Sequence, residues 1–472
     1  FSNFFIFVSF HYYNMVKIKI DISRKSGNTV VLPITEKSKR LAQLDRNFFK
    51  DVSFKQILKK GKVYIIGSYK SERDSLKFGA RLFRFLKNTK IDEVWIKFEK
   101  LNPKDVLIGL NLASYEFTKY KKDSEREIKI HLVGSKEKFE NIIKEVGTII
   151  ESVFLARDLE NEPANHLTPQ RFVDIAIDKL NDFENVVIRV FDENELKEMG
   201  FGGILAVGKG SSNPPRMLVI RYINGERDEK PIALVGKGVC FDTGGIHLKP
   251  TGYIEDMKLD MSGAAVVLAT IYAAAKLGIK KNIVGVIPLV ENMPSGSAVK
   301  PGDIIKMYNG KAVEVVNTDA EGRLMLADAV SYAEKRFRPE LIIDLATLTG
   351  AQIIALGTKI AAIMGNSKQY IKKLMKAGYE THEYLWKLPL PSFYENLVRG
   401  EISDIKNIPS PRSREAGCIV GGMFLKQFVK KTNWIHLDIA GPSIFESDWE
   451  WMTKGGTGFG VRLLLRFLQN SS

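Results

Sequence analysis

Residues 317–324 read NTDAEGRL, and they lie between the apolar runs KAVEVV and MLADAV. In an extended backbone successive side chains point to opposite faces, so Asp319, Glu321 and Arg323 would share one face. Two carboxylates on one face repel each other unless a positive charge lies between them. That charge is either Arg323 or a metal ion, and the rest of the chain has to distinguish the two.

Strand-like and helix-like segments alternate around this stretch. Apolar runs of strand length are NVVIRVF, RMLVIRY, IALVG, IVGVIPL, LIIDLA and WIHLDIA, whereas MSGAAVVLATIYAAAKLG and GRLMLADAVSYAEKRF are typical of helices. Such alternation predicts an α/β domain. We therefore expect a larger C-terminal α/β domain whose central sheet is mixed but mostly parallel.

A smaller α/β domain is expected before it, because KVYIIGS, DEVWIKF and EIKIHLVG alternate with the helical run ERDSLKFGARLFRFLKN. Apolar residues at helical spacing from Ile142 to Val153 then predict a long helix that ends before Pro163. The expected organisation is an upstream-translated extension at 1–14, an N-terminal α/β domain at 15–137, a linking helix and connection at 138–164, and the larger C-terminal domain at 165–472.

The composition favours a cytoplasmic protein that does not span a membrane. The chain has 472 residues, of which 44% are hydrophobic and 26% charged, as in ordinary globular proteins. Two cysteines cannot form a disulfide framework, and their spacing is not that of a zinc site, which fits a reducing compartment. The apolar run Phe4–Phe10 is shorter than the ~20 residues of a membrane span, and we interpret Met15 as the natural initiator.

The net charge of +15 raises the question of a nucleic acid partner. Lysine and arginine alternate with glutamate and aspartate throughout, for example in KKDSEREIKIH, and no long basic block exists. A solvated basic surface is therefore the first interpretation. Binding to DNA is kept as an alternative, secondary activity.

Two further segments contain lysines and acids beside glycines. In VGKGVCFDTGG (235–245) Lys237 follows an apolar strand, and Asp242 precedes two glycines. The segment lacks the Walker spacing of a phosphate loop, and Cys240 is interpreted as a buried small hydrophobe. In HLKPTGYIEDMKLDMSGAA (247–265) Lys249 lies in a loop, and Asp260 precedes a helix of small residues.

Asp242, Asp260, Asp319 and Glu321 together form a carboxylate set that suits paired divalent cations. Neither HExxH nor GxSxG is present, and the six histidines are scattered. A single histidine beside two glycines, His247, is more often a packing residue than a ligand or a base. The opening question is therefore answered in favour of a metal, with Arg323 and a helix N-terminus forming a site for a small oxyanion or a substrate carboxylate.

NTDAEGRL, together with VGKGVCFDTGG, the LKP and MKLDMSG segments and DLATLTGA, resembles the cytosolic leucyl aminopeptidase family of two-metal exopeptidases. The similarity runs from about Tyr115 to HLDIAG at 436–441, with order and spacing kept. It implies an enzyme that hydrolyses N-terminal residues, leucine and other apolar ones, from peptides, with a metal-bridging water as nucleophile. The metal ligands that it implies are Lys237, Asp242, Asp260, Asp319 and Glu321.

The resemblance also implies the remaining parts of the site. Lys249 would polarise the scissile carbonyl, and Arg323 would hold a bicarbonate that acts as general base. Two divalent ions per subunit, manganese or zinc, and a homohexamer are implied as well. A two-metal phosphoesterase, the alternative enzyme class, usually recruits His or Asn ligands, and the sequence has no such cluster. The side-chain pocket would be lined by Met257, Thr347, Gly350, Ala440 and Ser443.

Overall fold

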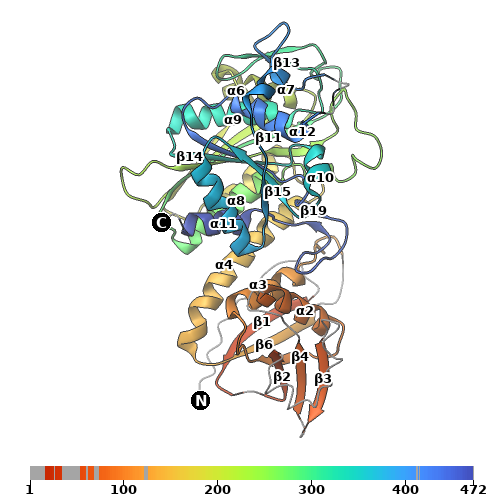
Figure 1. The fold of residues 1–472 in the computed structure, drawn as a ribbon, viewed down its shortest axis with the longest axis vertical. Coiled ribbons are helices and arrows are strands. Elements are labelled where there is room, and N and C mark those ends of the chain that lie inside the picture. The colour runs from red at the N-terminus through yellow and green to blue at the C-terminus, as the bar shows by residue number, and fades with distance from the viewer. Residues whose placement is uncertain are drawn as a thin grey trace. The chain divides into compact units, whose positions relative to one another are not determined.

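The structure is a computed structural model, and the chain folds into two compact units (Figure 1). One unit contains the chain up to Phe154 together with Glu446–Lys454, and the other contains Leu155–Phe445 and the chain from Gly455 onward. The expected extension at 1–14 lies outside the described residues. These are 16–25, 27–33, 54–59, 62–67, 74–121, 126–410, 413 and 415–470.

The first unit contains, among its described residues, a six-stranded sheet. Its spatial order is β1 (Val16–Ser23), β6 (Arg126–Val133), β5 (Glu93–Ile96), β2 (Thr29–Pro33), β4 (Lys62–Gly67) and β3 (Phe54–Lys59). Neighbouring strands run parallel except β3 and β4. Helices α2 (Ser75–Lys87) and α3 (Pro103–Ser114) pack so closely that a Cβ at Gly79 or Gly109 would collide with the backbone of the other helix.

The segment Glu446–Lys454 lies in the range expected for the C-terminal domain, but it belongs to the first unit. Lys77 forms an ion pair with Glu450 at 2.8 Å, and Arg84 donates to the Met452 carbonyl at 3.0 Å. The predicted long helix is confirmed as α4 (Lys136–Asn161), which ends before Pro163. The boundary between the units falls inside this helix, between Phe154 and Leu155.

The second unit contains, within the described chain, a nine-stranded sheet. Its order is β16 (Leu385–Lys387), β15 (Ala361–Gly365), β18 (Asn433–Asp438), β14 (Leu341–Ala346), β9 (Ile232–Gly236), β11 (Asn282–Asn292), β8 (Arg216–Ile223) and β7 (Val186–Phe191), and β10 (Gly238–Asp242) also pairs with β11. Pairing is antiparallel between β15 and β18 and along β11, β8 and β7, and parallel elsewhere. The predicted mixed, mostly parallel sheet is confirmed.

Two buried helices cover the opposite faces of this sheet (Figure 1). Val284 and Val286 of β11 belong to the same apolar cluster as residues of α9 (Gly322–Phe337). Gly285 lies between them, and a Cβ there would meet Ile271 and Val267 of α8 (Ser262–Leu277). Because successive strand residues point to opposite faces, α8 and α9 must lie on opposite sides. The predicted helices 261–278 and 322–337 are thereby confirmed.

No helix in the part of the chain that the structure describes combines the length and the apolar character that crossing a membrane requires.

Shorter elements complete the second unit. The helices are α5 (Pro169–Leu180), α6 (Glu193–Met199), α7 (Gly202–Gly208), α10 (Gly350–Leu356), α11 (Lys368–Thr381), α12 (Gly417–Lys426), α13 (Val461–Gln469) and the 3-10 helices η3 (Met257–Leu259) and η4 (Ser392–Val398), and the small sheets are formed by β12 (Ile304–Lys306), β13 (Ala312–Glu314) and β17 (Ile405–Lys406), and by β19 (Ile444–Phe445) and β20 (Gly455–Gly456).

The stretch NTDAEGRL is not extended, contrary to the first expectation. Ala320 donates its amide to the carbonyl of Asn317 at 3.3 Å, which forms a turn, and α9 begins at Gly322. The strand before the turn, β13, belongs to the small sheet with β12 and β17 and not to the central sheet. Asp319 and Glu321 are therefore brought together by a tight turn, and Arg323 lies in the first turn of the helix.

Candidate active site

Four segments of the second unit carry the predicted ligands, and each ends or begins a regular element. Lys237 directly follows β9, and Asp242 is the last residue of β10. A break in register at Cys240 interrupts the pairing of β10 with β11, and bulges of this kind re-aim the side chains that follow. Asp260 follows η3, and Glu321 is the residue before α9.

The side chains of these segments meet in a buried ionic cluster. The Nζ atom of Lys237 lies 2.7 Å from Asp260 Oδ1 and 2.8 Å from Glu321 Oε1. The Nζ atom of Lys249 lies 2.9 Å from Asp242 Oδ2, and it also forms an ion pair with Asp319. The structure thus brings together the five predicted ligands and the predicted catalytic lysine.

The donor set of this cluster fits divalent cations. Asp242, Asp319 and Glu321 each offer a carboxylate oxygen within 4.8 Å of the others. The second carboxylate oxygen of Asp260 is buried and, among the described residues, has no hydrogen-bond partner. Four carboxylates face only two lysines, so the cluster carries an excess of negative charge. Hard oxygen donors with uncompensated charge are the groups that divalent ions bind.

The excess of carboxylates over lysines also shifts the pKa values of the side chains in the cluster. Burial raises the pKa of Asp260 and of Asp319, and neighbouring carboxylates raise both further. Burial also acts to raise the pKa of Glu321, but the ammonium groups of Lys237 and Lys249 lower it overall. Burial alone would lower the pKa of Lys237, yet the surrounding carboxylates raise it above its usual range. The lysine is therefore an ammonium ion in this cluster.

Gly322 shows why a glycine follows Glu321 in this turn. A Cβ at position 322 would lie 2.5 Å from Cε of Lys237 and 2.9 Å from its Nζ. The lysine side chain therefore runs directly over the first residue of α9. The sequence contained this glycine, but its role depends on a contact between segments more than 80 residues apart, which no local pattern reveals.

Arg323 lies in the first turn of α9, next to the turn that carries Asp319 and Glu321. Its side chain is buried, and its NH1 group donates to the carbonyl of Asn407 at 2.6 Å. Nε has no hydrogen-bond partner within the described residues. Burial lowers the pKa of the guanidinium group only to about 10, so the group remains a cation. A cation with an unused donor at the start of α9 fits the predicted site for a small anion. Asn407, which also donates to the carbonyl of Asn317 at 2.6 Å, was missed by the sequence analysis.

Two of the predicted pocket residues, Thr347 and Met257, contact Asp260 of the cluster. Thr347 follows β14, and its hydroxyl donates to Asp260 Oδ1 at 2.7 Å. Met257 begins η3, and its carbonyl accepts the amide of Asp260 at 3.3 Å. Ser443 donates to the carbonyl of Ala440 at 3.1 Å. Gly350 is the first residue of α10.

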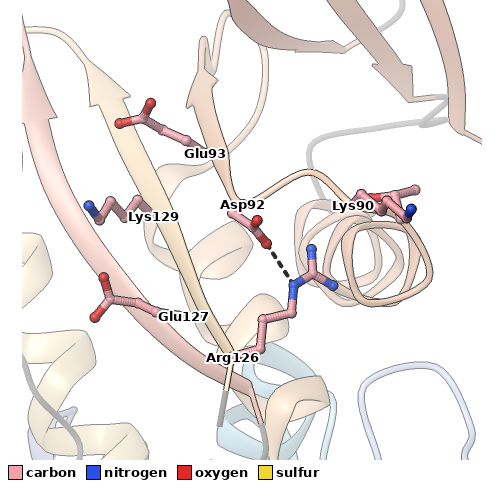
Figure 2. Close-up of a pocket in the computed structure, with 7 residues that line it drawn as sticks. Lys90, Asp92, Glu93, Arg126, Glu127 and Lys129 are labelled. Carbon is pink, nitrogen blue, oxygen red and sulfur yellow. Dashed lines mark hydrogen bonds and ion pairs between the residues drawn. The ribbon is translucent and has the colours of Figure 1, made fainter. Parts of the chain in front are cut away.

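A separate groove lies in the first unit (Figure 2). Its volume is about 760 Å³, and its walls are formed by the ends of β5 and β6 and the turn after α2. Arg126 donates to Asp92 at 2.7 Å and to the carbonyls of Leu86 and Ile91, so its guanidinium group holds the local fold together. None of the predicted site residues lies in this groove.

The second unit matches a known protein family. The profile of the cytosol aminopeptidase family, catalytic domain, covers residues 154–465. A protein named "Probable cytosol aminopeptidase" from Bradyrhizobium sp. strain BTAi1 is 40% identical over 437 residues, which span 89% of this chain and 86% of that protein. A namesake from Cenarchaeum symbiosum is 41% identical over 370 residues, which span 77% and 75% of the two chains.

Two solved structures share the fold along nearly the whole chain. The cytosol aminopeptidase from Coxiella burnetii has a TM-score of 0.85 and 29% identity, over 96% of this chain and 99% of that one. The bottromycin maturation enzyme BotP, solved in complex with Mn, has a TM-score of 0.83 and 29% identity, over 94% and 99%. From the profile match and the extent of these similarities, the chain belongs to the cytosol aminopeptidase family of metal-dependent aminopeptidases.

Proposed function

We propose that the protein removes N-terminal residues, leucine and other apolar ones, from peptides in the cytoplasm by a two-metal mechanism. The observation that carries this proposal is the buried cluster of four carboxylates and two lysines in the second unit. The names of the relatives support the reaction and the compartment. Neither alternative considered from the sequence, DNA binding or phosphoester hydrolysis, is favoured by a feature of the described structure.

In this proposal two divalent ions are held by Lys237, Asp242, Asp260, Asp319 and Glu321. When bound, the two ions would activate a water molecule and polarise the scissile carbonyl. From the family resemblance, Asp242 and Glu321 are proposed to serve both ions, and each contacts a lysine and lies near the other carboxylate. Lys237 must lose its proton to become a ligand, and two dications would supply the charge that makes this favourable.

The two remaining cations are proposed to act on the substrate and on a proton. Lys249 would hold the carbonyl oxygen as negative charge develops on it. Arg323, buried and with a free Nε donor among the described groups, would hold a bicarbonate that takes a proton from the attacking water. The substrate's free α-amine would be bound at the metal site, and this requirement restricts hydrolysis to the first residue of a peptide.

The residues of the side-chain pocket, the identity of the metal and the oligomeric state complete the proposal. Met257, Thr347, Gly350, Ala440 and Ser443 are proposed to line the side-chain pocket. Manganese or zinc is proposed as the metal, and the Mn complex of BotP supports manganese. A homohexamer is proposed from the family resemblance.

Metal-stripped protein tests the proposal directly. A panel of aminoacyl anilides would be offered to it, with Mn²⁺ or Zn²⁺ added back and the bound metal counted per chain. We expect no hydrolysis without metal, recovery at two ions per chain, and the fastest turnover with leucine. N-acetyl-leucine anilide, which has no free amine, is the matched control and should resist hydrolysis. Rapid cleavage of the acetylated compound, or full activity without metal, would refute the mechanism.

A further inference from the structure

The four acids come from three segments, which end or begin different elements, and their like charges repel each other. The lysines offset only part of this repulsion, since four carboxylates face two ammonium groups. Uncharged groups must therefore help to hold the segments in place. Such groups lie between the segment 242–249, which carries Asp242 and Lys249, and the turn 317–321, which carries Asp319 and Glu321.

Asn292, the last residue of β11, forms the first part of this connection. Its side-chain amide donates to Asp242 Oδ1 at 2.8 Å and to the carbonyl of Thr318 at 3.2 Å. Its own carbonyl accepts the amide of Thr243 at 3.0 Å and the Thr243 hydroxyl at 2.7 Å. One buried amide thus joins the end of the central sheet to both ligand segments. It also fixes the orientation of the Asp242 carboxylate without adding charge.

Thr318 and His247 form the second part. The hydroxyl of Thr318 donates to the carbonyl of Gly244 at 2.6 Å and accepts the amide of His247 at 2.9 Å. The amide of Thr318 in turn donates to Nδ1 of His247 at 3.2 Å. His247 and Thr318 are therefore joined through both backbone amides, one accepted by a hydroxyl and one by a ring nitrogen. Lys249 is two residues from His247, and Asp319 is next to Thr318.

The backbone amide of Thr318 contacts only one of the two ring nitrogens of His247, Nδ1. A backbone amide can only donate, so in this contact Nδ1 acts as the acceptor, and the Thr318 hydroxyl lies 3.3 Å from the same nitrogen. Nε2 takes no part in this contact. The role that this geometry gives to His247 is that of a hydrogen-bond acceptor at a fixed place.

We propose that His247 is a positioning residue for the reaction, acting through Thr318 to hold the loop of Lys249 against the turn of Asp319 and Glu321. The proposal rests on the proposed function, because the connected segments carry its ligands and its catalytic lysine. It goes beyond the sequence interpretation, which took His247 as a packing residue. Partners that orient metal ligands from outside typically contribute 10–100-fold to metal affinity or activity.

Two amide substitutions at position 247 test the proposal. Asparagine places an oxygen near the position of Nδ1, whereas glutamine places its oxygen near the position of Nε2. We expect His247→Asn to retain most of the wild-type kcat and Mn²⁺ affinity, and His247→Gln to lose about 10–100-fold in one or both, with little change in KM. Mn²⁺ affinity would be measured by calorimetry. Leu248→Ala, a change at an exposed neighbour in the same loop, is the control and should behave as wild type.

Hydrogen exchange gives a readout that needs neither metal nor activity. In the metal-free protein, the Thr318 amide should be protected in wild type and in His247→Asn, and exposed to exchange in His247→Gln. Equal protection in all three proteins would overturn the contact. If His247→Gln kept the wild-type kcat and His247→Asn lost it, the positioning role would be overturned. That result would favour a role for Nε2 in the chemistry. A wild-type protein without Mn²⁺ binding or hydrolysis would refute the proposed function, and the exchange result would still decide the contact.

Discussion

Lys249 contacts two carboxylates of the cluster, yet the proposed mechanism uses it as a cation and not as a ligand. Burial alone would lower its pKa, but Asp242 and the other acids raise it above its usual range, so the group stays charged. Its contact with the carbonyl oxygen should strengthen as charge develops there, which is a transition-state effect. Lys249→Ala should lower kcat by about 10²–10³ with KM little changed. A rise in KM at unchanged kcat, in steady-state assays, would contradict this role.

Glu321 forms an ion pair with Lys237, and one of its carboxylate oxygens lies within 4.8 Å of oxygens of Asp242 and Asp319. Because it is proposed to serve both ions, Glu321→Ala should leave both sites poorly formed. We expect less than one Mn²⁺ per chain by metal analysis and almost no turnover. Lys237 would keep its ion pair with Asp260 in this variant, so we expect the fold to be retained, as circular dichroism would verify. Full metal occupancy with normal turnover would exclude the assignment.

Glu160 provides a pH test outside the site. Burial raises the pKa of this carboxyl to about 8, against about 4.3 in an unfolded chain, while Gly458 and Arg157 lower it less. The folded state thus binds the proton more tightly, so the stability that this group contributes is present at low pH and is lost as pH rises toward 8. Glu160→Gln cannot ionise. Its melting temperature should fall less than that of wild type between about pH 5 and pH 8, and parallel curves would contradict the prediction.

At the scale of elements, the strands and helices of the second unit could be predicted from the sequence, because long apolar runs with clear ends leave little choice. Helix α9 begins at Gly322, where the sequence placed it, and α4 ends before Pro163. The failure is at NTDAEGRL, where an alternating pattern was interpreted as extended. A turn stabilised by Asn317 and Asn407 forms there instead, and the second asparagine is about 90 residues away in the chain.

The close approach of α8 to the central sheet gives a prediction for an element. A Cβ at Gly263 would collide with the carbonyl of Leu345 and lie 2.8 Å from the amide nitrogen of Lys237. Both are backbone atoms of the sheet, so the helix must move. Gly263→Ala should lower stability by about 1–3 kcal/mol, measured by thermal unfolding. Gly296→Ala is the control, because nothing lies within 4 Å of the added methyl group. Equal melting temperatures for the two variants would show that the helix adapts without cost.

At the scale of the whole molecule, net charge and local charge have opposite signs. The chain carries +15, but the candidate site has twice as many carboxylates as lysines. Composition could therefore not indicate the chemistry, whereas the motifs could. The residues of the cluster could be predicted because each lies in a distinctive short segment. Asn292, Thr318 and His247 could not be assigned, because their function depends on contacts between segments that only the fold brings together.

The proposed hexamer is a property of the whole molecule, and α10 offers a place to test it. Ile354 is 90% exposed and Ile353 is 40% exposed, and an apolar pair at the surface is often buried in an assembly. Light scattering should give about six times the 53.1 kDa of one chain. Ile354→Asp would place a charge in the contact, so we expect a smaller particle, whereas Gln369→Asp, the same charge at an exposed polar position, should not change the mass.

The two outcomes that would contradict this prediction have different meanings. A fully active monomeric wild type would remove the hexamer itself from the proposal. A hexameric Ile354→Asp would keep the assembly but exclude α10 from its contacts. Because α10 begins at Gly350, a proposed pocket residue, an assembly that orders this helix should also act on substrate binding. A dissociated Ile354→Asp variant should then show a raised KM for leucine substrates with its Mn²⁺ content unchanged, since none of the proposed ligands lies on this helix.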